Sequence, residues 1–310
     1  MGEARGCAGA YDLHVHSTYS DGSQTVEQII AEARELGLAR VGIVDHDCLR
    51  QLACVRRVSH AAGFPVLAGA EVSCRDSTTG RTVHMLAYGL EATPAGDGPV
   101  DRIVEETLAR RTANTLWQAW ALVQAGVEFD GWGVCFADLR RAARGSTGLY
   151  KQHVMYALTS LPYTDARYQA CYRKLFKGGG IVQRDIDYPE AADVVRAIRE
   201  QGGVPVLAHP AQMDSWASVP SLLQAGLLGI EVYHPDHDPA AQQHAREIAR
   251  EHGLIVTAGS DYHGYYGGPV LGECAIDPAE AGEGVEELFR REAKLVARAV
   301  AAAPAREDIA

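Results

Sequence analysis

Short apolar runs alternate with amphipathic segments over much of this chain. The runs have the length and composition of buried parallel strands, and they lie at residues 41–44, 66–70, 204–207, 229–233 and 254–259. Between them, segments such as 25–36 and 191–198 place apolar residues three and four positions apart, which is typical of a helix that buries one face. This alternation of strands and helices predicts an α/β fold.

The alternation changes after residue 70. Residues 71–74 and 83–90 predict the two arms of a hairpin, because a polar segment containing a glycine separates them. From about residue 91 to residue 180 the pattern is mainly helical; glycines and prolines mark the start of this segment, and three consecutive glycines mark its end. We therefore expect a helical insertion within the α/β fold.

Residue types that bind metal ions recur where the predicted strands end. His14 and His16 lie two residues apart in an N-terminal strand, so their imidazoles project from the same face. The other positions of this kind follow an apolar run directly; they are His46, Glu71, His209, Asp261 and His263. Because the carboxyl ends of the strands of an α/β barrel converge, these side chains are expected to meet.

The motifs that contain these residues resemble those of one known family. HxHSxxSDG at residues 14–22, DHD at 45–47, GAEVS at 69–73, AHP at 208–210 and GSDYHG at 259–264 occur in the order found in the polymerase and histidinol phosphatase (PHP) family of metallophosphoesterases. The similarity is greatest to the subgroup that hydrolyses nucleotide or sugar phosphates. It implies a distorted seven-stranded β/α barrel, into which the mainly helical segment described above is inserted as a cap. The chain is thus expected to consist of two barrel parts at 11–90 and 181–300, a cap at 91–180, and flexible tails at 1–10 and 301–310.

The resemblance also implies a set of metal ligands for three ions. The first ion would be held by His14, His16, Glu71 and Asp261, the second by Glu71, His153 and His209, and the third by Asp21, His46 and His263. This mixture of imidazoles and carboxylates suits Mn, Fe or Zn. Glu71, His46 and Asp261 are expected to carry catalysis, with a hydroxide between the ions attacking phosphorus. Asp12 and Asp45 are expected to orient imidazoles.

Charge points to candidate substrate contacts. The whole chain carries a formal charge of −11, yet nine Lys and Arg face only two acidic residues between Asp138 and Arg184. We expect Lys151 and Arg184 to contact a substrate phosphate, although most of the basic residues fit a solvated helix surface equally well. His84 and His234 are further candidates for substrate contact, and the alternative for each is a structural or solvated histidine.

Other features exclude several classes of protein. No apolar run reaches the length of a membrane span, residues 1–10 do not resemble a signal peptide, and the seven cysteines form no CxxC pair. A cytoplasmic protein without a membrane or stable nucleic-acid partner is expected, and the oligomeric state stays open. The predicted activity is hydrolysis of a small phosphate monoester. The alternatives are a phosphodiesterase, either cyclic or exonucleolytic, and a non-catalytic metal-binding module.

Overall fold

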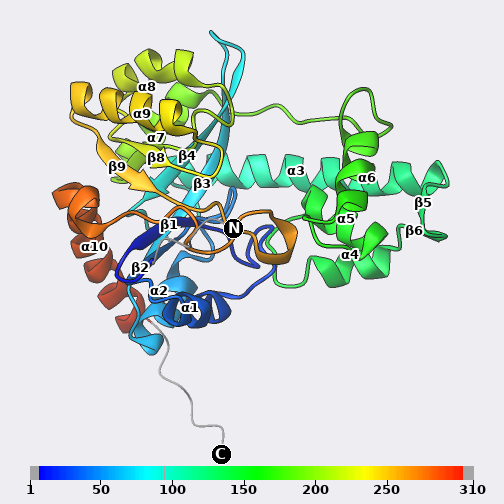
Figure 1. Cartoon of the computed structure of the whole chain (residues 1–310), viewed down its shortest axis with the longest axis horizontal. Coiled ribbons are helices and arrows are strands. Elements are labelled where there is room, and N and C mark those ends of the chain that lie inside the picture. Colours follow the sequence, from blue (N-terminus) through cyan, green and yellow to red (C-terminus); the bar gives the residue numbers. More distant parts are fainter. Residues whose placement is uncertain (1–6, 92, 94, 303–310) are drawn as a thin grey trace, which may run out of the picture.

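The computed structural model describes residues 7–91, 93 and 95–302. Its centre is a seven-stranded sheet, with helices on its outer side (Figure 1). The strands of this sheet are β1 (Tyr11–Val15), β2 (Arg40–Ile43), β3 (Val66–Asp76), β4 (Arg81–Tyr88), β7 (Val204–Leu207), β8 (Gly229–Tyr233) and β9 (Ile255–Ala258). The predicted runs therefore form strands, and β3 and β4 form the predicted hairpin.

The sheet curls into a nearly closed barrel. Its order is β1-β2-β3-β4-β7-β8-β9, and all neighbours are parallel except β4, which is antiparallel to both β3 and β7. A parallel bridge between Val15 and Tyr262 brings β1 beside the segment that follows β9. These features confirm the predicted distorted seven-stranded barrel, and they direct the carboxyl ends of the parallel strands toward one end of it.

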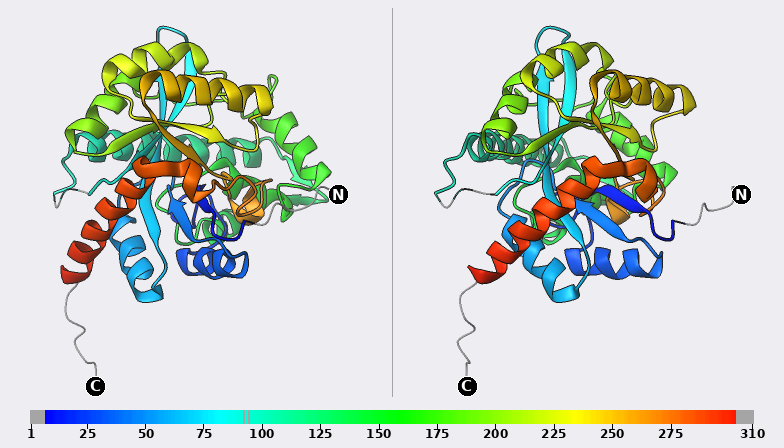
Figure 2. Two further views of the ribbon diagram at one scale, coloured as in Figure 1. Left: turned by 60° about the vertical axis from the view of Figure 1, so that its left-hand side comes forward. Right: turned by 90° about the vertical axis from the view of Figure 1, so that its left-hand side faces the viewer.

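Helices pack around the barrel (Figure 2). They are α1 (Val26–Glu35), α2 (Leu52–Ala62), α7 (Ala191–Glu200), α8 (Val219–Ala225), α9 (Pro239–His252) and α10 (Pro278–Ala301). Local sequence explains where several begin: Thr25 and Gln28 form a capping box on α1, and Asp238 caps α9 just before a proline. The predicted apolar stripe of α1, including Ile29 and Ile30, is buried in the main core.

The segment between β4 and β7 contains most of the remaining helices. They are α3 (Pro99–Gln124), α4 (Phe136–Ala142), α5 (Lys151–Thr159) and α6 (Ala166–Phe176), with a short hairpin of β5 (Glu128–Phe129) and β6 (Trp132–Gly133). The long helix α3 runs from the barrel into this lobe (Figure 1). A separate hydrophobic cluster that includes Leu122, Val154 and Phe176 holds the lobe together. We propose that residues 91–180 are the predicted cap.

The ends of the chain lie only partly within the described residues. Of the predicted flexible tails, residues 1–6 and 303–310 lie outside them. The Gly9 N–H donates to the Gly37 carbonyl, which attaches the start of the described chain to the end of α1, and α10 extends to Ala301. Within the described residues, no helix combines the length and hydrophobicity needed to cross a bilayer.

Closure of the barrel leaves no space for a side chain at Gly259. A Cβ atom built there would lie 2.0 Å from the Cβ of His14. We predict that Gly259→Ala lowers the free energy of unfolding by roughly 1–3 kcal/mol, because a crowded interior must shift to admit a methyl group. Chemical denaturation measures this. Gly133→Ala is the control, since the nearest atom to its Cβ would be 3.5 Å away; equal losses in both variants would contradict the explanation.

Candidate metal centre

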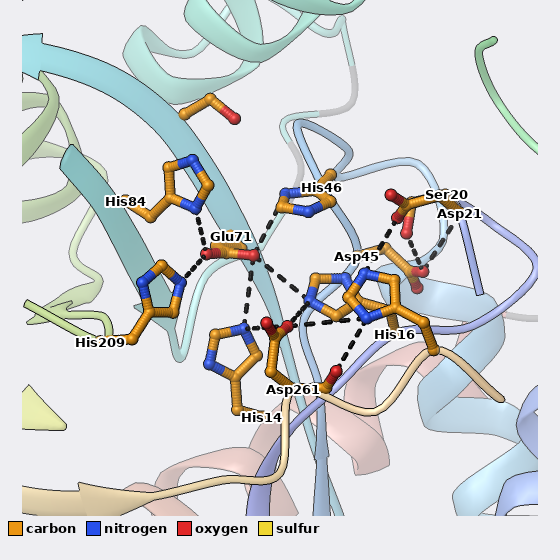
Figure 3. A network of polar contacts seen from close by, with 12 residues as sticks. His14, His16, Ser20, Asp21, Asp45, His46, Glu71, His84, His209 and Asp261 are labelled. Atoms are coloured by element: carbon orange, nitrogen blue, oxygen red, sulfur yellow. Dashed lines mark hydrogen bonds and ion pairs between the residues drawn. The ribbon is translucent and has the colours of Figure 1, made fainter. Parts of the chain in front are cut away.

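A buried carboxylate on β3 lies at the centre of the site (Figure 3). Glu71 is fully buried, and each of its oxygens faces a different set of imidazoles. Its Oε2 lies 3.3, 3.2 and 3.1 Å from nitrogens of His14, His16 and His46, and its Oε1 lies 2.7 and 2.8 Å from nitrogens of His84 and His209. This is the arrangement of a carboxylate that can bridge two ions.

Two further carboxylates complete the cluster. Asp261, which follows β9, places Oδ1 3.1 Å from Nε2 of His16. Asp21 places Oδ1 3.4 Å from Nε2 of His263. His209 and Asp261 adopt positive φ angles of 24° and 53°, which non-glycine residues rarely occupy. The fold holds these two residues in strained conformations, as is common at functional sites.

The charges of the cluster stabilise one another. Burial alone would raise the pKa of Glu71, but the positive charges of His46, His84 and His14 hold this pKa well below its usual value. The pKa of Asp261 is also held well below its usual value, because His263 and His16 outweigh the effect of its burial.

The donor atoms fit metal ions better than they fit one another. In the described part of the chain, several buried donor atoms of the cluster have no hydrogen-bond partner: Nε2 of His14, both ring nitrogens of His16, Oδ1 of Asp21, Nδ1 of His46 and Oε2 of Glu71. Unsatisfied buried polar atoms are costly, so their concentration here fits a donor set that binds cations. Four groups place one donor atom of each member within 4.8 Å of the others. These groups could hold divalent cations.

Most of the predicted ligands come together as expected. One group is His14, His16, Glu71 and Asp261, which is the set predicted for the first ion. A second group contains Asp21, His46 and His263, predicted for the third ion, and adds His16.

The set predicted for the second ion differs from what the structure contains. His153 is absent from every candidate group in the described residues; its Nδ1 accepts a hydrogen bond from the Tyr150 N–H, 3.3 Å away, at the start of α5. His84 lies beside Glu71 and His209 instead. Its position on β4 follows from the hairpin pairing, which sets His84 opposite Ser73, two residues from Glu71.

Glu231 on β8 orients two of the candidate ligands. Its carboxylate lies 3.1 Å from Nδ1 of His14 and accepts the backbone N–H of His209 at 2.9 Å. A proton on Nδ1 leaves Nε2 of His14 free to coordinate a metal ion. A single buried acid within an apolar strand was the only sequence signal for this role. Asp12 and Asp45, expected to orient imidazoles, instead accept hydrogen bonds from Ser260 and Ser17 and fix the neighbouring loops.

His234 lies among the candidate ligands but differs from them in its hydrogen bonding. Its Nδ1 accepts the Asp236 N–H at 3.1 Å, so a neutral ring carries its proton on Nε2. That nitrogen is buried, lies 3.5 Å from Asp261 Oδ2 and has no hydrogen-bond partner. His234 therefore lies within the cluster with Nε2 facing Asp261, and its contact with a substrate stays a prediction.

A cavity of about 120 Å³ adjoins the cluster and is here named the cationic cavity. The cluster residues Asp21, His46 and His84 line one part of it, and the basic side chains Arg111 and Lys151 line another. Arg184, also predicted to bind phosphate, lies elsewhere, with its exposed guanidinium 4.8 Å from the ring centroid of Trp117. Arg111 lies outside the basic segment singled out in the sequence, and nothing in the sequence separated it from its neighbour Arg110.

Known proteins resemble this chain over most of its length. A family model described as the PHP domain matches residues 12–142. A phosphoribosyl 1,2-cyclic phosphate 1,2-diphosphodiesterase from Eggerthella lenta is 47% identical over 83% of this chain and 95% of its own length. The chain belongs to the PHP family. It is a metal-dependent phosphoesterase, a hydrolase acting on phosphate ester bonds.

Two other members extend the comparison. A 3′,5′-nucleoside bisphosphate phosphatase from Chromobacterium violaceum is 29% identical over 81% of this chain and 86% of its own length. A solved structure from Bifidobacterium adolescentis, described as a metal-dependent phosphoesterase, covers 92% of this PHP enzyme and 96% of that chain, with a TM-score of 0.78 and 26% identity. The family and its general chemistry are thus shared, while the substrates of these relatives differ.

The bridging position of Glu71 predicts an unequal loss of metal. Glu71→Gln should remove more metal per chain than His263→Asn, because Glu71 faces two groups of ligands and His263 only one. Elemental analysis of protein purified without chelator measures the content, which we expect to be two to three equivalents in the unmodified enzyme. Equal losses in the two variants would argue against a bridging carboxylate.

Glu231→Gln should weaken metal binding without unfolding the protein. We expect affinity to fall about tenfold to a hundredfold, because the carboxylate that fixes the proton of His14 is replaced. Competition with a chelator measures the affinity. Glu292→Gln is a matched control, since this buried carboxylate pairs with Arg56 and belongs to no candidate ligand group in the described chain. A similar loss of affinity in the control would show that any buried acid has this effect.

Proposed function

We propose that this PHP enzyme opens a cyclic phosphodiester on a phosphorylated pentose and then hydrolyses the resulting monoester. Of the activities considered from the sequence, we therefore favour the cyclic phosphodiesterase. Hydrolysis of a monoester, the activity predicted first, becomes the second step of its reaction. Two observations support this order: the 47% identity to the diphosphodiesterase, and the cationic cavity beside the metal centre. A substrate with a second phosphate would place that group between Arg111 and Lys151.

The position of the Arg111 guanidinium at the cationic cavity is the observation that supports the proposal most strongly. One guanidinium nitrogen contacts Asp47 Oδ2 and Ser73 Oγ, each at 2.8 Å, and these contacts fix the side chain. Its Nε is buried and has no hydrogen-bond partner. A fixed guanidinium with a free donor, at the edge of a cavity that reaches the ligands, suits a phosphate oxygen.

Lys151 lines the same cavity from the first turn of α5. Burial and the neighbouring Arg111 lower the pKa of its ammonium group, whereas Asp185 raises it. A bound phosphate dianion would compensate the repulsion between the two cations. The two basic side chains therefore provide a place for an anion at a fixed distance from the metal centre.

We propose that three divalent ions, Mn in the first instance, bind at His14, His16, Glu71 and Asp261, at Glu71, His84 and His209, and at Asp21, His46 and His263. When bound, such ions would acidify water and neutralise charge on the phosphoryl oxygens. The first water adds to phosphorus and breaks one P–O bond, giving a monoester. A second water breaks the other bond, giving inorganic phosphate and a free diol. We propose that the Nε2–H of His234 protonates a leaving oxygen, since this nitrogen is buried in the cluster and has no hydrogen-bond partner.

The direct test is an assay with a ribose 1,2-cyclic phosphate that also carries a phosphate on C5. We expect one equivalent of inorganic phosphate per substrate, with a bisphosphorylated ribose as intermediate, detected by phosphorus NMR. The same assay after removal of metal should show no turnover. Hydrolysis of simple monoesters with no opening of the cyclic ester would reject the proposed order and restore the monoesterase interpretation.

The second phosphate provides a prediction for the cationic cavity. Lys151→Met should lower kcat/KM by about one to two orders of magnitude, because a charge-assisted contact of about 1.5–3 kcal/mol is lost. Arg111→Lys should also lower it, since a lysine keeps the charge but loses the planar donor geometry. Metal content should not change in either variant.

Arg173→Met is the control for these substitutions. Arg173 is exposed on α6 and lines no part of the cationic cavity, so its replacement should change kcat/KM little. A Lys151→Met enzyme with unchanged kcat/KM would show that this lysine does not contact the substrate.

A further inference from the structure

A second and larger cavity also reaches the metal centre. It has a volume of about 470 Å³, and the cluster residues His234, Asp261 and His263 line its inner part. Gln152 lines both this cavity and the cationic cavity, so the two adjoin. A substrate whose phosphorus lies at the centre can therefore extend one substituent into each cavity.

The second cavity differs from the first in charge: Arg111 and Lys151 line the first together with Asp21 and Asp185, whereas the charged groups of the second are carboxylates and histidines. Its outer part carries two carboxylates, Asp236 and Glu273, and no Lys or Arg is among the described residues that line it. We name it the acidic cavity. Asp236 Oδ2 accepts the amide N–H of Gln212 at 2.8 Å, and Glu273 Oε2 accepts the Val270 N–H at 3.0 Å. These bonds hold both negative charges beside the path of a substituent.

The remaining lining suits an uncharged group. Tyr163 and Tyr266 provide aromatic surface, and Gln152 and Gln212 provide amide donors and acceptors. Pockets that bury small organic groups have volumes of about 300–1,000 Å³, a range that includes the acidic cavity. The buried, unpartnered Nε2 of His234 lies where this cavity meets the centre, so a leaving oxygen can be protonated from this side.

We propose that the acidic cavity accepts an uncharged substituent on phosphorus, and that Asp236 and Glu273 exclude a second negative charge from it. This inference rests on the proposed function and extends it to specificity. A nucleic-acid strand carries phosphates on both sides of each internal phosphodiester. One of them would have to enter the acidic cavity, where two carboxylates repel it. Small esters charged on one side only are accepted, and polynucleotides are rejected.

Two synthetic phosphodiesters test this exclusion. Both carry a phosphopropyl arm that can reach the cationic cavity, and they differ in the second arm, which is either nitrophenyl or sulfonated nitrophenyl. Release of the nitrophenolate gives kcat/KM for each. The intrinsic reactivities of the two leaving groups cancel when the ratio of these values is compared between wild type and variants.

We expect the double variant Asp236→Lys with Glu273→Lys to raise kcat/KM for the sulfonated probe, relative to the neutral probe, by about tenfold. The milder pair Asp236→Asn with Glu273→Gln should give an intermediate ratio, and it serves as well if the lysine variant folds poorly. The control is Glu247→Lys with Glu251→Lys, which makes the same charge change on the exposed surface of α9. Its ratio should stay within about twofold of wild type.

Two results would overturn the inference. One is a ratio that is the same in wild type and in both cavity variants. The other is failure of wild type to cleave the neutral probe, since the cavity would then not accept an uncharged arm. Turnover of the phosphorylated cyclic ribose is measured on the same preparations. Its absence would count against the proposed function, whereas its presence with an unchanged ratio would count against the exclusion alone.

Discussion

One buried carboxylate determines much of this structure. Glu71 lies among five imidazoles contributed by β1 and the residue that follows it, by β4 and by loops that follow β2 and β7. A carboxylate removed from water is stable only when positive charge or hydrogen bonds replace the lost hydration, so Glu71 requires these neighbours or the cations that they would bind. The barrel meets this requirement by directing the ends of its strands toward one point. Metal binding and barrel closure are therefore two aspects of the same constraint.

The elements around the two cavities contribute side chains of different charge. The cap helices α3 and α5 place Arg111 and Lys151 on one side of the centre, and the loops after β8 and β9 place Asp236 and Glu273 on another. The barrel supplies the ligands, while the neighbouring segments determine what can approach them. Relatives with a common set of ligands could thus differ in substrate through changes outside the barrel strands.

The sequence predicted the fold and most members of the candidate ligand groups, because local patterns along the chain specify both. Apolar runs define the strands, and His14, Glu71 and Asp261 lie directly at their ends. The errors concern contacts between distant segments. His153 was placed beside Glu71, where the structure has His84, because spacing along the chain does not reveal which histidine a hairpin turns inward. Arg111 was overlooked because only packing distinguishes it from the exposed Arg110.

The central claim is that Glu71 bridges metal ions that carry out phosphate ester hydrolysis. Anomalous diffraction from crystals grown with Mn measures this most directly. The account predicts a peak on each side of the Glu71 carboxylate, one beside His14 and His16 and the other beside His84 and His209, with a third beside Asp21 and His263. A single peak that does not contact Glu71, in crystals of active enzyme, would contradict it.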